Sequence, residues 1–219
     1  PVGFSWFGVA NFRGLKLNCS GFEFGGKIRG EQMSERFDFL KTSIPGLSVI
    51  RRKPILDSRG CFTRFFCVDE FKEVEFDQAM VQINTTLTKG KGTVRGLHYQ
   101  KSPNAEIKLV SCVKGEIFDV AVDVRRNSPT FLKWHAEFLS EENQTGLYIP
   151  KGFAHGFQAI TPDCRVLYMH SERYDPISAA GLNADDPTLA IDWPLPISER
   201  SIFDTNIEPI DGSFEGVEA

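Results

Sequence analysis

Apolar and polar residues alternate along most of the chain after residue 43. In IFDVAVDV, residues 117–124, phenylalanine and valines alternate with aspartates and alanine, and this period of two predicts a β-strand with one buried face. Runs of similar length follow at short intervals, separated by Ser-Pro, Asn, Gly and Pro-Asp turn signals. The predicted strands comprise residues 108–113, 117–124, 131–139, 146–150, 156–160 and 164–170. Only VDEFKEVEF, residues 68–76, has a helical pattern.

Many short and evenly spaced strands are typical of an antiparallel sandwich or jelly roll. The fold class that we expect is therefore all-β, with a few short helices. Lys114-Gly115 separates the first two of these strands and predicts a hairpin turn between them. A chain of 219 residues is long enough for one domain with a single sizeable core.

The domain is expected to span residues 43–200, between an N-terminal extension of uncertain role, residues 1–42, and a C-terminal tail, residues 201–219. Residues 1–32 have neither helical nor strand periodicity, and no function is assigned to them. They lack the pattern of a secretory signal, and Met33 reads like a natural start.

Composition excludes several classes of protein. The net charge of −4 and the pI near 5.6 give no basic surface for nucleic acid. The chain has no run of eighteen apolar residues, so a membrane span is not supported. The five cysteines are odd in number and have no CxxC spacing, which favours reduced thiols in a cytoplasmic protein over a disulfide framework or a zinc site.

Two motifs carry the candidate chemistry. In GTVRGLHYQ, Gly92 stands six residues before His98, and PKGFAH, residues 150–155, follows later, so that the pair resembles the two motifs of cupin jelly rolls. Gln100 stands where the second cupin histidine would be, and Glu106 comes later than the motif requires. Because a stable transition-metal site needs three or four well-placed ligands, we expect the cupin fold without a metal.

Four segments together resemble the dTDP-4-dehydrorhamnose 3,5-epimerase family, over a stretch from about Ile44 to Pro194. These segments are RGLHYQ (95–100), KLVSCVKGEIFDVAVDVRRNSPTF (108–131), IPKGFAHGFQ (149–158) and DPTLAIDWP (186–194). The resemblance implies a metal-free and cofactor-free cupin jelly roll that forms a homodimer. It also implies a nucleotide-diphosphate sugar as substrate, namely a 4-keto-6-deoxy sugar whose C3, C5 or both are inverted through an enolate.

Inversion beside a ketone needs a base on one face of the sugar and an acid on the other. His98 is the best candidate base, because an imidazole titrates near neutral pH. By resemblance, Asp186 is the carboxylate that supports His98, although the adjacent Asp185 leaves that choice open. The resemblance also implies Tyr168 as the acid and Lys108 as the cation near the enolate oxygen.

Further residues match positions that bind the nucleotide sugar in this family. A diphosphate favours arginine, whose planar guanidinium suits phosphate oxygens. The predicted binding residues are Arg59, Phe62, Gln82, Asn84, Arg95 and His155. Phe62 could stack on the base, and the resemblance implies that the segment around Arg59 crosses to the neighbouring subunit, so that each site is shared.

Other interpretations remain open from the sequence. A single-carbon epimerase acting on a CDP- or GDP-linked sugar would need the same acid and base. A non-catalytic cupin sugar-binding protein, or a metal-dependent cupin oxygenase or isomerase, is also possible, but Gln100 argues against a metal enzyme and His98 with Tyr168 argues against a mere binder. Structural roles compete as well: Tyr168 and His155 could belong to the core, and Lys108 could be a solvated residue at a strand end.

Overall fold

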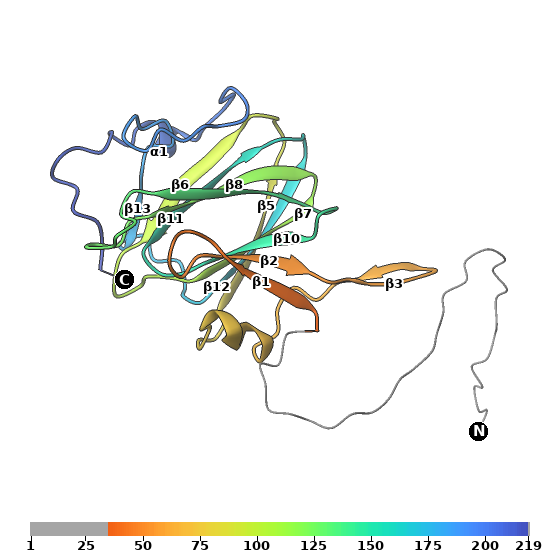
Figure 1. Ribbon diagram of the computed structural model, residues 1–219. Helices are drawn as coiled ribbons and strands as arrows, with labels where there is room; N and C mark the ends of the chain where they lie inside the picture. Colours follow the sequence, from red (N-terminus) through yellow and green to blue (C-terminus); the bar gives the residue numbers. More distant parts are fainter. Residues whose placement is uncertain (1–34, 219) are drawn as a thin grey trace, which may run out of the picture. The chain divides into compact units, whose positions relative to one another are not determined.

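A computed structural model describes residues 35–218 of the chain (Figure 1). Thirteen strands and two short helices make up its regular structure within that range. The strands are β1 (Phe37–Lys41), β2 (Ser48–Arg52), β3 (Ile55–Asp57), β4 (Gly60–Phe62), β5 (Gln82–Thr88), β6 (Val94–Gln100), β7 (Lys108–Lys114), β8 (Glu116–Asp123), β9 (Trp134–Ser140), β10 (Thr145–Ile149), β11 (Phe153–Ala159), β12 (Cys164–His170) and β13 (Ala179–Gly181). The helices are the 3₁₀-helix η1 (Glu70–Val74) and the α-helix α1 (Ile202–Thr205).

Two antiparallel sheets face each other. The six-stranded sheet has the order β1-β2-β10-β7-β12-β5, and the five-stranded sheet has the order β13-β6-β11-β8-β9. Strands β3 and β4 form a separate two-stranded hairpin, and Figure 1 shows β3 extending away from the two sheets. The all-β fold with a few short helices is therefore confirmed.

The core lies between the two sheets, and each sheet is also covered on its outer face. Side chains from both sheets meet in the middle, among them Val110 and Leu147 from one sheet and Ile117 and Phe157 from the other. Phenylalanines around η1 pack on the outer face of the six-stranded sheet. Residues from the segment 182–217 cover the outer face of the five-stranded sheet. The molecule therefore buries three apolar layers.

Strand β8 departs from the prediction of one buried face, because both of its faces are buried. Its valines, including Val120 and Val122, point outward and are covered by the segment 182–217. Its Asp119 and Ala121 point inward, between the sheets, and are also fully buried. A segment distant in sequence supplies the second cover, which the pattern of β8 alone cannot reveal.

The hairpin predicted at Lys114-Gly115 is wrong. Strand β7 pairs with β10 and β12, whereas β8 pairs with β11 and β9, so the chain crosses here from one sheet to the other. Gly115 makes the crossing possible with a φ of 76°, and a Cβ at this position would lie 2.5 Å from Thr161 Oγ1. A tight glycine turn is compatible with both arrangements.

The helix predicted over residues 68–76 is shorter than expected and is a 3₁₀-helix, η1. It ends at Glu75, which adopts a left-handed conformation with a φ of 60°. Phe71 is the buried residue of η1, and its ring packs edge-on against Phe37 of β1. A helix of five residues is sufficient to place this ring on the sheet.

Both segments outside the predicted domain limits contain ordered structure. Strand β1 falls within residues 1–42 and pairs with β2, while residues 201–218 contain α1 and part of the outer cover. Residues 1–32, to which no function is assigned, lie outside the described residues. No helix within residues 35–218 is long and apolar enough to cross a membrane.

Candidate active site

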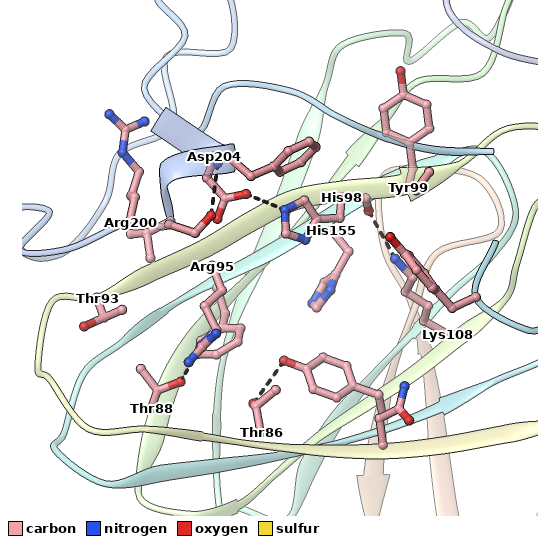
Figure 2. A pocket seen from close by; sticks show the side chains of 18 of the residues that line it. Thr86, Thr88, Thr93, Arg95, His98, Tyr99, Lys108, His155, Arg200 and Asp204 are labelled. Atoms are coloured by element: carbon pink, nitrogen blue, oxygen red, sulfur yellow. Dashed lines mark hydrogen bonds and ion pairs between the residues drawn. The ribbon is translucent and has the colours of Figure 1, made fainter. Parts of the chain in front are cut away.

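A cavity of about 830 Å³ opens between the two sheets. Its walls come from β5, β6, β7, β11 and β12, and one rim is formed by the segment around α1. Six of the ten residues predicted to act in catalysis or binding line it: Asn84, Arg95, His98, Lys108, His155 and Tyr168. Figure 2 shows His98 and Thr86 on opposite sides of the cavity.

A bulge in β6 explains how both Arg95 and His98 reach the cavity. In a regular strand two residues three positions apart would point to opposite faces of the sheet. Here β6 has two residues between its partners on β11 where β11 has only Gly156, and this extra residue restores the common face. Gly96 occupies the bulge at a φ of 127°, and a Cβ there would lie 2.5 Å from Gly156 Cα. The glycine is thus required by close contact between the backbones.

His98 has a carboxylate partner on α1. Its Nε2 lies 2.5 Å from Asp204 Oδ1, and the Asp204 side chain is almost completely buried whereas the imidazole remains half-exposed to the cavity. Burial alone would raise the pKa of Asp204, but the hydrogen bond and charge of His98, together with the Ser201 hydroxyl, hold that pKa below its usual range. The carboxylate is therefore ionised and can stabilise a protonated His98.

Tyr168 stands in the opposite sheet, on β12, with its hydroxyl 3.5 Å from Thr86 Oγ1. Its ring lies between two imidazoles, edge-on to His155 at 6.1 Å and stacked with His170 at 6.0 Å between ring centroids. Burial raises the pKa of Tyr168, and the Thr86 hydroxyl only partly opposes this effect. The phenol is consequently neutral at physiological pH and has a proton to donate.

His155 is buried and forms part of the cavity wall. Its Nε2 lies 2.8 Å from Asp119 Oδ1 on the neighbouring strand β8. Burial raises the pKa of Asp119, although the charge and hydrogen bond of His155 counteract it. His155 is thus a buried, hydrogen-bonded histidine that also lines the cavity, and its contact with a ligand stays a prediction.

Lys108 brings a buried cation to the cavity. Its ammonium group donates to the backbone carbonyl of His98 at 3.1 Å and lies 3.1 Å from Glu106 Oε1. Glu106 also receives a hydrogen bond from His170 Nδ1 at 2.7 Å. Burial would raise the pKa of Glu106, but His170 and Lys108 hold it below its usual value, so that an ionised carboxylate fixes the lysine. This arrangement contradicts the alternative of a solvated lysine at a strand end.

Comparisons with known proteins identify the family of this chain. The sequence profile of dTDP-4-dehydrorhamnose 3,5-epimerase matches residues 41–210. The chain belongs to the dTDP-4-dehydrorhamnose 3,5-epimerase family. A relative of that name from Methanothermobacter thermautotrophicus is 41% identical over 177 residues, which cover 80% of this chain and 95% of the relative.

Solved structures of this epimerase family confirm the cupin-type jelly roll. The dTDP-6-deoxy-D-glucose-3,5-epimerase from Legionella pneumophila, in complex with dTDP-4-keto-L-rhamnose, superposes with a TM-score of 0.77 at 38% identity and covers 84% of this chain and 99% of its own. A 3′-monoepimerase from Streptomyces bikiniensis in complex with dTDP-quinovose has a TM-score of 0.67 at 29% identity, covering 82% of this chain and 86% of its own.

The carboxylate partner of His98 differs from the one predicted for this member of the epimerase family. Neither Asp186 nor Asp185 bonds to His98. Asp186 is buried, and its carboxylate accepts hydrogen bonds from the backbone amides of Thr188 and Ile210. Asp186 therefore stabilises its own turn and the backbone at Ile210, and the carboxylate beside His98 is that of Asp204.

Asp204 is the main site residue that sequence reasoning missed. It lies in the segment set aside as a tail, and its local pattern, Ser201 three residues earlier, predicts only a helix cap. That cap is present, because the Asp204 amide donates to Ser201 Oγ at 3.0 Å. Thr86, the hydrogen-bond partner of Tyr168, was also missed, since a threonine within a strand gives no signal of its own.

Two predicted binding residues of this epimerase-family chain lie away from the cavity, on the β3–β4 hairpin. The Arg59 side chain is 86% exposed and pairs only locally, with Asp57. Phe62 is 65% exposed. Neither lines the cavity of its own chain. A contribution to a site would therefore require a second copy.

Two polar residues of β5 differ in position. Asn84 lines the cavity, with its amide nitrogen 3.5 Å from His170 Nε2. Gln82 lies just outside it and accepts a hydrogen bond from the Tyr174 amide at 3.2 Å. Arg95 lines the cavity and donates to Thr88 Oγ1 at 2.9 Å. Asn84 and Arg95 are thus placed to meet a ligand directly.

Within residues 35–218 no three His, Cys, Asp or Glu side chains gather as a set of metal ligands. Gln100, which replaces the second cupin histidine, uses its amide to bind the backbone at Asn104, Arg173 and Asp175. Of the cysteines, Cys61, Cys67, Cys112 and Cys164 are free thiols, and Cys19 lies outside the described residues.

Proposed function

We propose that this protein is an isomerase that inverts C3 and C5 of dTDP-4-dehydro-6-deoxy-D-glucose to give dTDP-4-dehydro-L-rhamnose. The observation that carries the proposal is the presence of the His98 imidazole and the Tyr168 phenol in one cavity, each with its own hydrogen-bond partner. A C4 ketone acidifies the protons on both adjacent carbons, because the carbanion spreads onto the oxygen as an enolate. The cavity supplies a base and an acid for such carbons.

Each polar group has a defined part in this reaction. His98 removes the proton, and the Asp204 carboxylate stabilises the imidazolium that results. Tyr168 returns a proton from the opposite face, which its neutral phenol allows. Lys108 has three N–H donors, two of which meet His98 O and Glu106, so the third can be directed to the enolate oxygen.

The reaction is best tested by following solvent hydrogen into the sugar. Purified protein would be incubated with dTDP-4-keto-6-deoxyglucose in heavy water, and proton NMR would record exchange at C3 and C5. Exchange and inversion at both carbons are expected. Exchange at neither carbon would contradict the proposal and favour a sugar-binding protein without catalysis.

A single-carbon epimerase is the second candidate, supported by the similarity to the 3′-monoepimerase from Streptomyces bikiniensis. The same acid and base would serve it, since only the presentation of the sugar differs. In the heavy-water experiment this enzyme would invert C3 or C5 alone. Parallel assays with CDP- and GDP-linked 4-keto sugars would identify the nucleotide that the protein prefers.

The active form is proposed to be a homodimer with shared sites. The support is the exposed β3–β4 hairpin, whose Arg59 and Phe62 are far from the cavity of their own chain yet suit a diphosphate and a base. Mixing two inactive variants tests this arrangement. His98→Ala and Arg59→Ala should each be weak alone, whereas mixed dimers should regain one intact site and measurable activity. Mixing without any recovery would contradict shared sites.

Catalysis is proposed to need neither metal nor cofactor, since Lys108 and Tyr168 supply the donors that an enolate requires. Exhaustive dialysis against a chelator is expected to leave kcat/KM unchanged. Activity that disappears on chelation and returns only with a divalent ion would overturn this part of the proposal. A cytoplasmic location, which the free thiols support, also remains a prediction.

A further inference from the structure

The helix that carries Asp204 buries little apolar surface, and Phe203 makes a ring contact with His98, at 6.0 Å between ring centroids. Of its residues, Ile202 is 83% exposed and Phe203 is 61% exposed, and Asp204 alone is buried. A helix of four residues has too few hydrogen bonds to be stable by itself. Besides this ring contact, the bond to His98 and the Ser201 cap, polar contacts on either side of α1 hold the Asp204 carboxylate in position.

One side chain makes such contacts on both sides. Asn183 Oδ1 accepts a hydrogen bond from Arg200 Nη1 at 2.8 Å, and Asn183 Nδ2 donates to the carbonyl of Ile207 at 2.8 Å. Arg200 precedes α1 and Ile207 follows it. A single amide thus brackets the helix, and both of its polar atoms are used to do so.

A second side chain secures the chain farther on. The buried carboxylate of Asp186 accepts from the amide of Ile210 with one oxygen and from the amide of Thr188 with the other. The first bond fastens the segment after α1, and the second closes the turn that carries Asp186 itself. Asp186 therefore holds the chain at Ile210, three residues after Ile207, which Asn183 holds.

The segment that carries these two residues is anchored directly beside His98. Leu182 exchanges backbone hydrogen bonds with Leu97, at 2.9 and 3.2 Å, and Gly181 lies opposite His98 in the pairing of β13 with β6. The contacts form a closed circuit from His98 through β13 and Asn183 to α1, and back through Asp204. A displacement of Asn183 would therefore move the Asp204 carboxylate relative to the His98 imidazole.

We propose that Asn183 and Asp186 are positioning residues that hold the Asp204 carboxylate against His98. The proposal rests on the role of His98 as the catalytic base, and it deepens that role by naming what keeps the base paired. Neither residue touches the imidazole, so both act through the segment 200–210.

The variant Asn183→Ala removes both contacts that bracket α1. We expect kcat/KM to fall about 10- to 100-fold, as for other small displacements of catalytic groups. The acid limb of its pH profile should move to lower pH, because a less securely held carboxylate stabilises the imidazolium less. Asn183→Asp, which keeps the acceptor for Arg200 and loses the donor for Ile207, should shift the limb in the same direction and covers the case in which the alanine variant does not fold.

Asn143 offers a matched control. Like Asn183, it uses both polar atoms of its amide: it makes three hydrogen bonds to backbone groups of Ser140, Thr145 and Phe138, in a turn that does not line the cavity. Asn143→Ala should lower the thermal midpoint of unfolding without moving the pH profile. A loss of stability common to both variants is thereby separated from an effect on His98.

Two further measurements decide the matter. In an Asp204→Asn background, Asn183→Ala should have no additional effect on kcat/KM, because the carboxylate to be positioned is gone. NMR of the His98 ring nitrogens without substrate should show Asn183→Ala and Asp186→Asn moving toward the Asp204→Asn spectrum. This readout needs no epimerase activity. It therefore distinguishes failure of the positioning role of Asn183 and Asp186 from failure of the proposed function. Wild-type His98 spectra and wild-type pH limbs in the folded Asn183 and Asp186 variants would overturn the proposal.

Discussion

His98 and Asp204 stand 106 positions apart in the sequence and 2.5 Å apart in the fold. The local motif around His98 is sufficient to propose it as the base, and motif position likewise selects Tyr168 and Lys108, which line the same cavity. Asp204 could not be selected in this way, because the pattern around it describes a helix cap and says nothing of what its carboxylate contacts. Asp186, the partner that was predicted instead, is buried but bonds to the backbone amides of Thr188 and Ile210.

The corrected partner leads to a prediction with an internal control. Asp204→Asn removes the charge that stabilises the imidazolium and is expected to lower kcat by about 10²- to 10⁴-fold. Asp185→Asn, which changes an exposed carboxylate of the predicted pair, should leave kcat near the wild-type value. Steady-state kinetics on both variants checks this. A larger loss in Asp185→Asn than in Asp204→Asn would favour Asp185, the alternative that the sequence leaves open.

Tyr168→Phe separates the acid from the base. If His98 alone removes the proton, this variant should still exchange substrate hydrogen for deuterium on the histidine side while forming little inverted sugar. The ring keeps its packing between His155 and His170, so a purely structural tyrosine would lose only one weak hydrogen bond to Thr86. Proton NMR in heavy water measures both quantities, and undiminished inversion would return Tyr168 to the core.

Among the elements, the six strands from β7 to β12 were predicted from the sequence, whereas the ranges of β1 to β6 and of β13 were not, and neither was the pairing of the strands. Alternation and turn residues locate a strand such as β12, whose bounds coincide with the predicted 164–170. Pairing depends on which distant segment arrives beside a strand, and the turn at Gly115 has the same composition whether it closes a hairpin or joins two sheets. The inward face of β8 shows the same limit, since burial of Asp119 depends on His155 from β11.

The bulge in β6 gives a prediction at this scale. Gly96→Ala would place a Cβ against Gly156 as well as in an unfavourable φ, and we expect it to cost about 3 kcal/mol or more of unfolding free energy. Gly60→Ala has a similar φ of 135° with no atom within 4 Å, so it should cost about 1 kcal/mol from the backbone alone. Urea denaturation of both variants separates steric contact from conformational strain. Equal costs would refute the proposed role of the close backbone approach.

For the molecule as a whole, stability at low pH depends on buried carboxylates. Asp123 at the end of β8 accepts hydrogen bonds from Arg125, Ser128 and Thr130 and is completely buried. Burial would raise its pKa, but these bonds hold the pKa below its usual range. Because the pKa is lower in the folded chain than in the unfolded one, this stabilisation is complete above about pH 4 and is lost as the pH falls toward the folded value.

Asp123→Asn is therefore expected to lower the free energy of unfolding by about 1 to 3 kcal/mol at neutral pH. Its difference from the wild type should shrink as the pH falls below about 4. Asp211→Asn is the matched control, because Asp211 also has a lowered pKa but is exposed and bonds only to Ser213. Denaturant unfolding at several pH values measures both, and a pH-independent deficit for Asp123→Asn would contradict this account.

The segment 182–217 has two duties, since it carries Asp204 to His98 and covers the outward valines of β8. Detachment of this segment would separate Asp204 from His98 and expose the apolar surface of β8 at the same time. Molecules that lose activity because this segment detaches should therefore aggregate, and few of them should remain in solution. Loss of activity and the onset of turbidity would then have the same cause. An additive that slows aggregation should therefore also preserve activity.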